Sequence, residues 1–422
     1  MAAIPNSPYL SIMSSYYNSP DRRFSMQPIV RDLYANYVGD LSDGDLKKHL
    51  DRYAAADYRS EWQDAFERTR VLQQYNVSMR HRGQRLASSI VLNYRHDNMG
   101  MADDRETSLM FKYSGQWEAT KWLNINFGTT VINNREKTNV LRPGINDYTP
   151  IHSLYNPDGS LADLTLGFDE NVPAMQNPSY GLKSMWYNPL AETDMGLRRS
   201  RDTNMRTYVQ GIFKLLPGWT VSGHFQYEDI YFKSETYKEA ESYSMRSIYN
   251  RYTMLDPATN GVKHNVPDGG RLDTSTSEGN YWTFRGQTQY ANVLFGKLDV
   301  DAIAGFEFRE SRTRSYSNVL MGYDDQTQNN QNENINWYDL SRLLGKASVM
   351  GPDYRAGSLG GGNATSGDIL HRFYSIYATG NFVYDSKYAL SGSWRIDKTD
   401  LFGTDPKFRG RPLWSVGASW NM

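Results

Sequence analysis

The chain has 422 residues, with 46 basic and 47 acidic side chains, and aromatic residues make up 14% of it. The balanced charge gives no reason to expect a nucleic acid partner. No apolar run reaches the about 18 residues that a transmembrane helix needs. The absence of cysteine excludes disulfides, thiolate metal sites and cysteine nucleophiles.

The first seventy residues carry weak strand and helix signals. Residues Tyr9–Tyr17 are predicted to form a short first strand, and residues 21–69 a long loop that is partly helical. Residues 1–20 have no charged segment followed by an apolar core, so they do not resemble a signal peptide. We therefore expect either that the signal is missing from this numbering or that the chain is an internal piece of a longer protein.

From residue 71 onward, apolar and polar residues alternate with a period of two, which predicts β-strands. In Thr107–Trp117 one face reads Leu109, Phe111, Tyr113 and Trp117, whereas the other carries polar residues such as Lys112. With the two segments already named, we predict about twelve strands. The others are Val71–Arg82, Leu86–His96, Leu123–Ile132, Met205–Leu215, Trp219–Phe232, Tyr281–Leu294, Leu298–Arg312, Ile369–Tyr384, Tyr388–Ile396 and Leu413–Trp420.

The connections between these strands alternate in length. Short turns lie at one end of the strands, and long loops at about 133–204, 233–280 and 313–368 lie at the other. Outer-membrane barrels have short periplasmic turns and long extracellular loops, whereas a soluble sandwich mixes loop lengths at both ends. The pattern predicts an all-β antiparallel meander in the outer membrane of a Gram-negative bacterium, with residues 1–70 as a first strand and loop, and residues 71–422 as barrel strands.

The more apolar parity of each strand is predicted to face lipid. The residues with this expectation are Phe111, Phe127, Trp219, Phe225, Phe306, Phe382, Leu390, Trp394, Trp414 and Trp420. By the same alternation, His224 and His371 should face the lumen. The short basic run Arg198–Arg201 is interpreted as a solvated strand-to-loop junction, with a contact to an acidic glycan or lipopolysaccharide as the alternative.

Aromatic residues in the long loops are the candidates for ligand binding, because sugar rings stack on tyrosine and tryptophan faces; packing of the loops against one another is the alternative. The candidates are Trp186, Tyr187, Tyr249, Tyr252, Trp337 and Tyr338. The seven histidines show no spacing typical of a metal site, and no catalytic set can be assembled. We therefore expect no enzyme activity, no cofactor and no metal.

Four segments of the chain resemble the SusC/RagA-type TonB-linked outer-membrane transporters. They are Glu61–Arg68 with Gln74–Ser78, Asn188–Ala191 followed by Leu216–Trp219, Arg372–Tyr377 followed by Tyr384–Tyr388, and Trp394–Asp397 followed by Phe402-Gly403 and Arg411–Gly417. The chain departs from the family at Lys398–Leu401, where a glycine and an arginine are usual, so it resembles a divergent member.

The resemblance implies the first half of a barrel of about 22 strands, open if taken alone. It also implies import of oligosaccharides or peptides together with a SusD-like surface lipoprotein, energised by the TonB complex through a plug domain that we expect outside this chain. Two other interpretations stay open at this point. One is a passive porin or adhesion barrel, and the other is a soluble all-β carbohydrate-binding protein.

Overall fold

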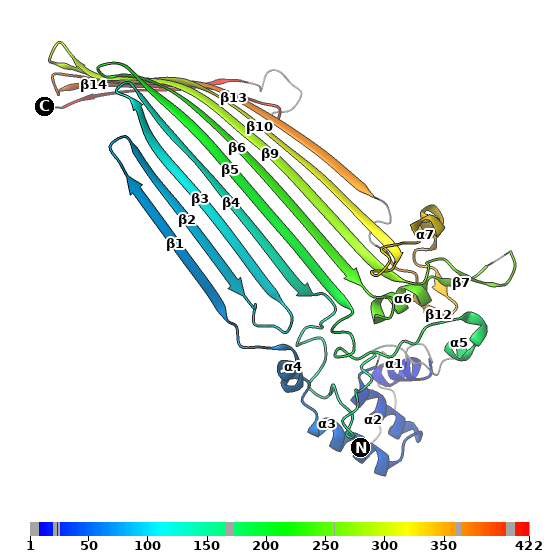
Figure 1. Cartoon of the computed structure of the whole chain (residues 1–422). Helices are drawn as coiled ribbons and strands as arrows, with labels where there is room; N and C mark the ends of the chain where they lie inside the picture. Colours follow the sequence, from blue (N-terminus) through cyan, green and yellow to red (C-terminus); the bar gives the residue numbers. More distant parts are fainter. Residues whose placement is uncertain are drawn as a thin grey trace.

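The computed structural model describes residues 8–19, 23, 26–165, 173–256, 258–359, 364–401 and 410–421. Its centre is an eleven-stranded antiparallel sheet, in which each strand pairs with its neighbours along the chain (Figure 1). The strands are β1 Leu72–Arg82, β2 Leu86–Asp97, β3 Arg105–Thr120, β4 Leu123–Asn139, β5 Gly196–Leu216, β6 Trp219–Lys238, β9 Gly270–Leu294, β10 Leu298–Tyr323, β13 Thr365–Tyr384, β14 Tyr388–Thr399 and β15 Pro412–Trp420.

The sheet is not closed. In the described part of the chain, β1 pairs only with β2 and β15 only with β14, so both remain edge strands. The predicted antiparallel meander that is open when taken alone is therefore confirmed.

The helices gather at one end of the sheet, together with the long loops and two small hairpins, while the short turns lie at the other end (Figure 1). These elements are α1 Pro8–Tyr17, α2 Pro28–Val38, α3 Asp43–Ala55, α4 Tyr58–Phe66, α5 Pro173–Gln176, α6 Tyr243–Arg251, α7 Trp337–Leu343, β7 Thr253–Leu255, β8 Val262–His264, β11 Ala347–Ser348 and β12 Gly351–Arg355. None of the helices in the described residues is long and apolar enough to cross a membrane.

The strand predicted at Tyr9–Tyr17 is wrong, because this segment forms α1. Its apolar residues Leu10, Met13 and Tyr17 are spaced by three and four, which places them on one face of a helix. That face packs against α2, where the rings of Tyr17 and Tyr34 lie 5.2 Å apart between centroids. The helical spacing in α1 therefore prevails over the weak alternation from which the strand was predicted.

Several strands continue well beyond their predicted ends. β5 begins at Gly196 instead of Met205, and β10 runs to Tyr323 instead of Arg312. Next to the predicted strand ends, both extensions are rich in Arg, Ser, Thr and Asn and carry no apolar alternation, which is why the sequence indicated loops there. The true loops are shorter than predicted: a first loop at 140–195, a second at 239–269 and a third at 324–364.

The register separates two faces of the sheet, because directly opposed residues on neighbouring strands share a face. Phe127 lies opposite Val209, and Val209 lies opposite Phe225. Followed from strand to strand, this register places all ten residues predicted to contact lipid on one face, here called the apolar face. Their common face is confirmed, while their contact with lipid stays a prediction.

The apolar face is apolar only along the part of each strand nearest the short turns. On β10, alternate residues from Leu298 to Phe308 are all apolar, and Glu310, Arg312 and Arg314 follow. On β5 the corresponding stretch runs from Leu215 back to Met205 and contains one polar residue, Thr207. A tilted strand crosses the hydrocarbon core in about 9–11 residues, which matches the length of both stretches.

Glycines opposite aromatic rings fix the pairing of the central strands. A Cβ atom on Gly286 would lie 2.7 Å from ring atoms of Phe306, its neighbour across β9 and β10. On the opposite face, a Cβ atom on Gly305 would lie 2.6 Å from the hydroxyl of Tyr377. Each ring lies over the glycine backbone, in the space that a side chain would otherwise fill. A shift of register would place another residue beneath the ring, and the side chain of that residue would clash with it.

Gly218 in the β5–β6 turn provides a test of these backbone contacts. Its φ is +82°, and an alanine Cβ there would overlap the carbonyl oxygen of Ala291 in β9. Gly296 in the β9–β10 turn has a similar φ of +68°, but no atom lies within 4 Å of its virtual Cβ. Both substitutions to alanine should lower the free energy of unfolding by about 1–2 kcal/mol, because a residue with a Cβ atom is disfavoured in the left-handed conformation.

Gly218→Ala should lower the free energy of unfolding by at least about 1 kcal/mol more than Gly296→Ala does. Only Gly218→Ala also displaces a neighbouring strand. The free energy of unfolding in urea, measured for both variants in the same detergent, checks this. Equal losses would show that the contact with Ala291 relaxes without cost.

Candidate functional site

The three long loops and α4 pack into one layer over the end of the sheet. Phe66 of α4 belongs to a buried cluster with Leu154 of the first loop. Met185 of the first loop belongs to a second cluster with Met350 of the third loop. A third cluster joins the second loop to the third, and includes Met245 and Leu340. The candidate ligand-binding aromatics therefore lie in a structured layer, called the loop layer below.

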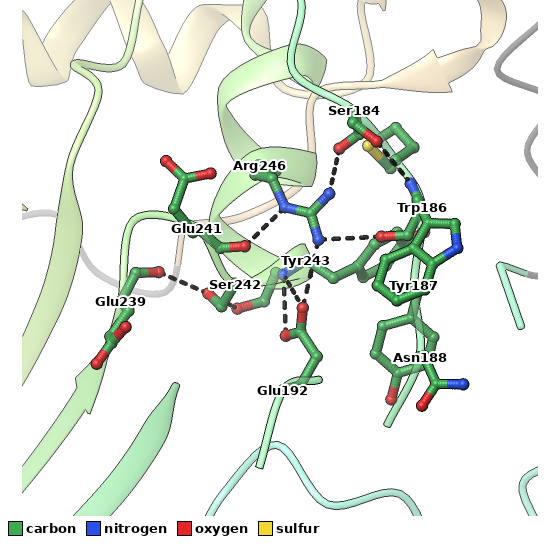
Figure 2. A network of polar contacts seen from close by, with 12 residues as sticks. Ser184, Trp186, Tyr187, Asn188, Glu192, Glu239, Glu241, Ser242, Tyr243 and Arg246 are labelled. Carbon is green, nitrogen blue, oxygen red and sulfur yellow. Dashed lines mark hydrogen bonds and ion pairs between the residues drawn. The ribbon is translucent and has the colours of Figure 1, made fainter. Parts of the chain in front are cut away.

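A buried ion pair joins the first loop to α6 (Figure 2). Arg246 is 8% exposed and Glu192 is 3% exposed, and Arg246 Nη2 lies 3.3 Å from Glu192 Oε1. The same guanidinium donates to the backbone carbonyls of Ser184 at 2.5 Å, Trp186 at 3.0 Å and Glu241 at 2.7 Å. Because Arg246 binds two segments of the first loop at once, it positions the backbone of Trp186.

Glu192 also caps the N-terminus of α6. The residue before the helix, Ser242, makes no side-chain cap, and the backbone N–H of Tyr243 instead donates to both oxygens of Glu192, at 2.8 and 2.9 Å. A carboxylate at this position is favoured by the partial positive charge of the helix N-terminus. Burial raises the pKa of Glu192, and the Tyr243 N–H and the Arg246 guanidinium oppose that rise.

Asn188 and Pro189, from one of the segments noted for their resemblance in the sequence analysis, are buried within the same loop. The Asn188 amide donates to the carbonyls of Leu154 at 2.9 Å and Ala162 at 2.7 Å, and its oxygen accepts from the Leu190 N–H at 2.9 Å. Asn188 thus binds backbone groups at both ends of a small hairpin, residues 154–162. In this structure the motif has a structural role within the loop layer.

The six predicted aromatics occupy different environments within the loop layer. Tyr252 is buried and donates its hydroxyl to the Gly357 carbonyl, and Tyr187 packs on Tyr243 with ring centroids 5.1 Å apart. Trp186 and Tyr249 are half-buried. The Tyr249 ring stacks on His264 at 4.7 Å.

The two α7 residues differ from each other as well. Trp337 packs against the cluster that contains Leu340, whereas Tyr338 is 70% exposed. Trp186, Tyr249, Trp337 and Tyr338 therefore keep ring surface that a ligand could reach, and Tyr252 does not. Ligand binding by any of the six stays a prediction.

A polar groove on the other face of the sheet was not found from the sequence. It has a volume of about 550 Å³ and is lined by Gln210, Ser222, His224, Gln226, Thr283, Arg285, Gln287, Glu307 and Arg309. His224, Arg285 and Glu307 lie directly opposite one another on β6, β9 and β10. Arg285 Nε donates to Glu307 Oε2 at 2.8 Å.

The alternation of each strand indicated a polar face, and it correctly placed His224 and His371 there. The alignment of His224, Arg285 and Glu307 depends on the register between strands that are far apart in sequence. It could not be read from a single strand.

Comparison with known proteins identifies the fold. No family model matches the sequence, and no curated protein matches it. Among solved structures, the RagAB peptide transporter matches 98% of this chain with a TM-score of 0.57 and 12% sequence identity. The RagAB peptide importer in the "closed-closed" state matches 85% of this chain with a TM-score of 0.58 and 13% identity.

The chain spans 39% and 35% of the length of these two solved chains. The structural likeness confirms, at the level of the fold, the resemblance seen in the sequence motifs. The open eleven-stranded sheet matches the fold of a partial β-barrel.

Arg246→Met should release the first loop from α6. Removing one partner of a buried ion pair typically costs about 3–5 kcal/mol, because the other charge stays buried without compensation. Hydrogen exchange should therefore quicken in segments 183–187 and 243–250, but not in β9 or β10. Arg251→Met, which changes an exposed arginine of the same helix, is the control. Unchanged exchange in Arg246→Met would contradict the role given to this ion pair.

His152 should make the contact between α4 and the first loop sensitive to pH. It is 7% exposed, its Nε2 atom has no hydrogen-bond partner in the described structure, and burial lowers its pKa below the ordinary 6.5. Above pH 6.5 the imidazole is neutral whether the loop is closed or open. As the pH falls below 6.5 the open form takes up a proton first, so the closed form loses stability until it protonates too.

Hydrogen exchange of α4 amides, corrected for the intrinsic rate, should therefore be faster at pH 5.5 than at pH 7.5. His152→Gln should remove most of this difference. A pH dependence that persists in the variant would assign the effect to another group.

Proposed function

We propose that this chain is part of the barrel wall of a TonB-dependent outer-membrane importer of oligosaccharides or peptides. The observation that carries the proposal is the two-faced open sheet, with its long loops at one end, that follows the RagAB transporter along 98% of this chain. In this proposal the apolar face contacts lipid, and the loop layer lies on the outside of a Gram-negative cell.

The polar face supports transport through the lumen. A hydrated path or an enclosed plug requires hydrogen-bonding side chains along the wall, and the groove around Arg285 and Glu307 supplies them. In this proposal a SusD-like surface lipoprotein covers the loop layer. The TonB complex acts from below through a plug domain contributed by sequence outside this chain. We propose no catalytic residue and no cofactor.

A passive porin or adhesion barrel is the second candidate, because a two-faced sheet with a polar groove suits a water-filled pore as well. Energy dependence separates the two. Cells that carry the intact protein should take up labelled oligosaccharide or peptide, and an uncoupler or loss of TonB should abolish uptake. Uptake that survives both treatments would establish the passive pore and reject the importer.

A soluble carbohydrate-binding protein is less compatible with the sheet, because its apolar face would be exposed to water across eleven strands. Fractionation provides the measurement: the protein should sediment with outer membranes and require detergent for release. A monodisperse protein without detergent would favour the soluble alternative.

The half-buried aromatics Trp186 and Tyr249 of the loop layer should contribute to substrate affinity. An aromatic contact is worth about 0.5–1.5 kcal/mol, so the double variant Trp186→Ala/Tyr249→Ala should weaken binding about tenfold if both rings stack on substrate. Phe295→Ala is the control, because Phe295 is 95% exposed in a short turn at the opposite end. Calorimetry with the transported oligosaccharide or peptide measures the change. Equal affinity of all three proteins would show that these rings only pack the loops.

A further inference from the structure

A block of basic side chains lies on the apolar face, just beyond the apolar stretches of β3, β4, β5 and β6. The residues of this basic block are Arg105, Arg135, Lys137, Arg199, Arg201 and Lys233. In one register row Arg135 lies opposite Arg201, and Arg201 lies opposite Lys233. In the next row Arg105 lies opposite Lys137, and Lys137 opposite Arg199. The sheet therefore sets cations directly side by side on four strands.

The basic run expected at a strand-to-loop junction lies inside β5, and alternation divides it between the two faces. Arg199 and Arg201 belong to the basic block, while Arg198 points to the polar face, where its Nε donates to Thr236 Oγ1 at 3.2 Å. This division gives each face its own arginines from one short segment.

Carboxylates compensate little of this charge. Within the described residues the block makes a single ion pair, between Lys233 and Glu235 at 2.7 Å. Arg135 donates to the neutral side chain of Asn133 at 3.2 Å. Like charges directly opposite each other destabilise a sheet. The arrangement therefore opposes the stability of the isolated wall, and a bound anion would relieve that repulsion.

The same face carries compensated arginines only a few strands away. Arg312 and Arg314 lie 2.5 Å and 3.7 Å from Asp368, and Arg372 lies 2.7 Å from Glu310. These pairs lie beyond the apolar stretches of β10 and β13, at the corresponding boundary. The missing carboxylates are therefore specific to β3–β5 and are not a general property of this boundary. On β6 the same face carries Asp229 and Glu235, and Glu235 lies directly opposite Arg199.

The position of the block identifies its ligand. It begins four residues beyond Leu109, Val131 and Met205, where the apolar stretches of β3, β4 and β5 end on this face. With the apolar stretches in hydrocarbon, the block lies at the level of the headgroups of the outer leaflet. Arginine binds phosphate through paired N–H groups, and each basic residue near an anionic membrane surface contributes about 1 kcal/mol.

We propose that the basic block binds the phosphate groups of a phosphorylated glycolipid of the outer leaflet, whose acyl chains lie along the apolar residues below. The site is separate from the substrate path, since it faces away from the lumen. This proposal rests on the membrane location given in the proposed function, but it does not depend on import or on TonB.

Direct binding to a defined glycolipid tests this site. The intact protein in a neutral detergent is titrated with lipid A that carries both phosphates, and separately with the fully dephosphorylated form, and native mass spectrometry counts the bound lipid. The variant Arg135→Gln/Arg199→Gln/Arg201→Gln removes the centre of the block. Arg198→Gln removes the adjacent arginine on the polar face and is the matched control.

The phosphorylated lipid should bind the unaltered protein and Arg198→Gln equally, and should bind the triple variant at least about tenfold more weakly, with an affinity that falls as salt rises. The dephosphorylated lipid should bind all three proteins weakly and alike. Equal binding of the phosphorylated lipid to the triple variant, or equal binding of both lipids to the unaltered protein, would overturn the proposal.

Thermal unfolding without lipid supplies an independent readout. Because the triple variant relieves repulsion between opposed cations, its midpoint should equal or exceed that of the unaltered protein. Addition of phosphorylated lipid should raise the midpoint only when the block is intact. A triple variant that fails to fold, or a lipid shift that persists in it, would count against the proposal. Lipid binding without energy-dependent uptake would reject the importer and leave this site standing.

Discussion

The structure depends on the satisfaction of backbone hydrogen bonds between strands. In hydrocarbon no water is available, so every strand needs a partner on both sides and a spanning sheet must close. Eleven consecutive antiparallel strands leave β1 and β15 running in the same direction. They cannot pair with each other in an antiparallel barrel. Closure therefore requires an odd number of additional strands, and two copies of this sheet in the same orientation would meet the same conflict.

The alternation of apolar and polar residues along each strand makes one face of the sheet apolar and the other polar. Because Phe127, Val209 and Phe225 share a register row, a slip of one residue in β5 would turn its apolar residues toward the polar groove. A covered glycine opposes such a slip: a Cβ atom on Gly128 of β4 would lie 2.9 Å from the ring of Tyr208, its neighbour on β5. The same register that builds a surface suited to lipid thus aligns His224, Arg285 and Glu307 on the opposite face.

The sequence predicted the sheet well because alternation is a local signal. It found the spanning part of β3–β6 and the turn at Gly218, and it failed at α1, where the spacing of Leu10, Met13 and Tyr17 was overlooked. It also began β5 at Met205 instead of Gly196, since the polar residues beyond the apolar stretch carry no alternation of hydrophobicity. The contact of Arg246 with Glu192 joins residues 54 positions apart in two irregular segments. No local pattern could have indicated it.

The loop layer is held by buried polar contacts as much as by apolar clusters. Arg246, Glu192 and Asn188 together satisfy backbone groups of the first and second loops, and each contact has several partners. A buried network of this kind is stable when complete and costly when partly broken. Opening one loop alone would break several of these contacts at once. Entry of a substrate would therefore more readily displace the loop layer as a unit, with its hinges where the loops meet the ends of β4, β5 and β6.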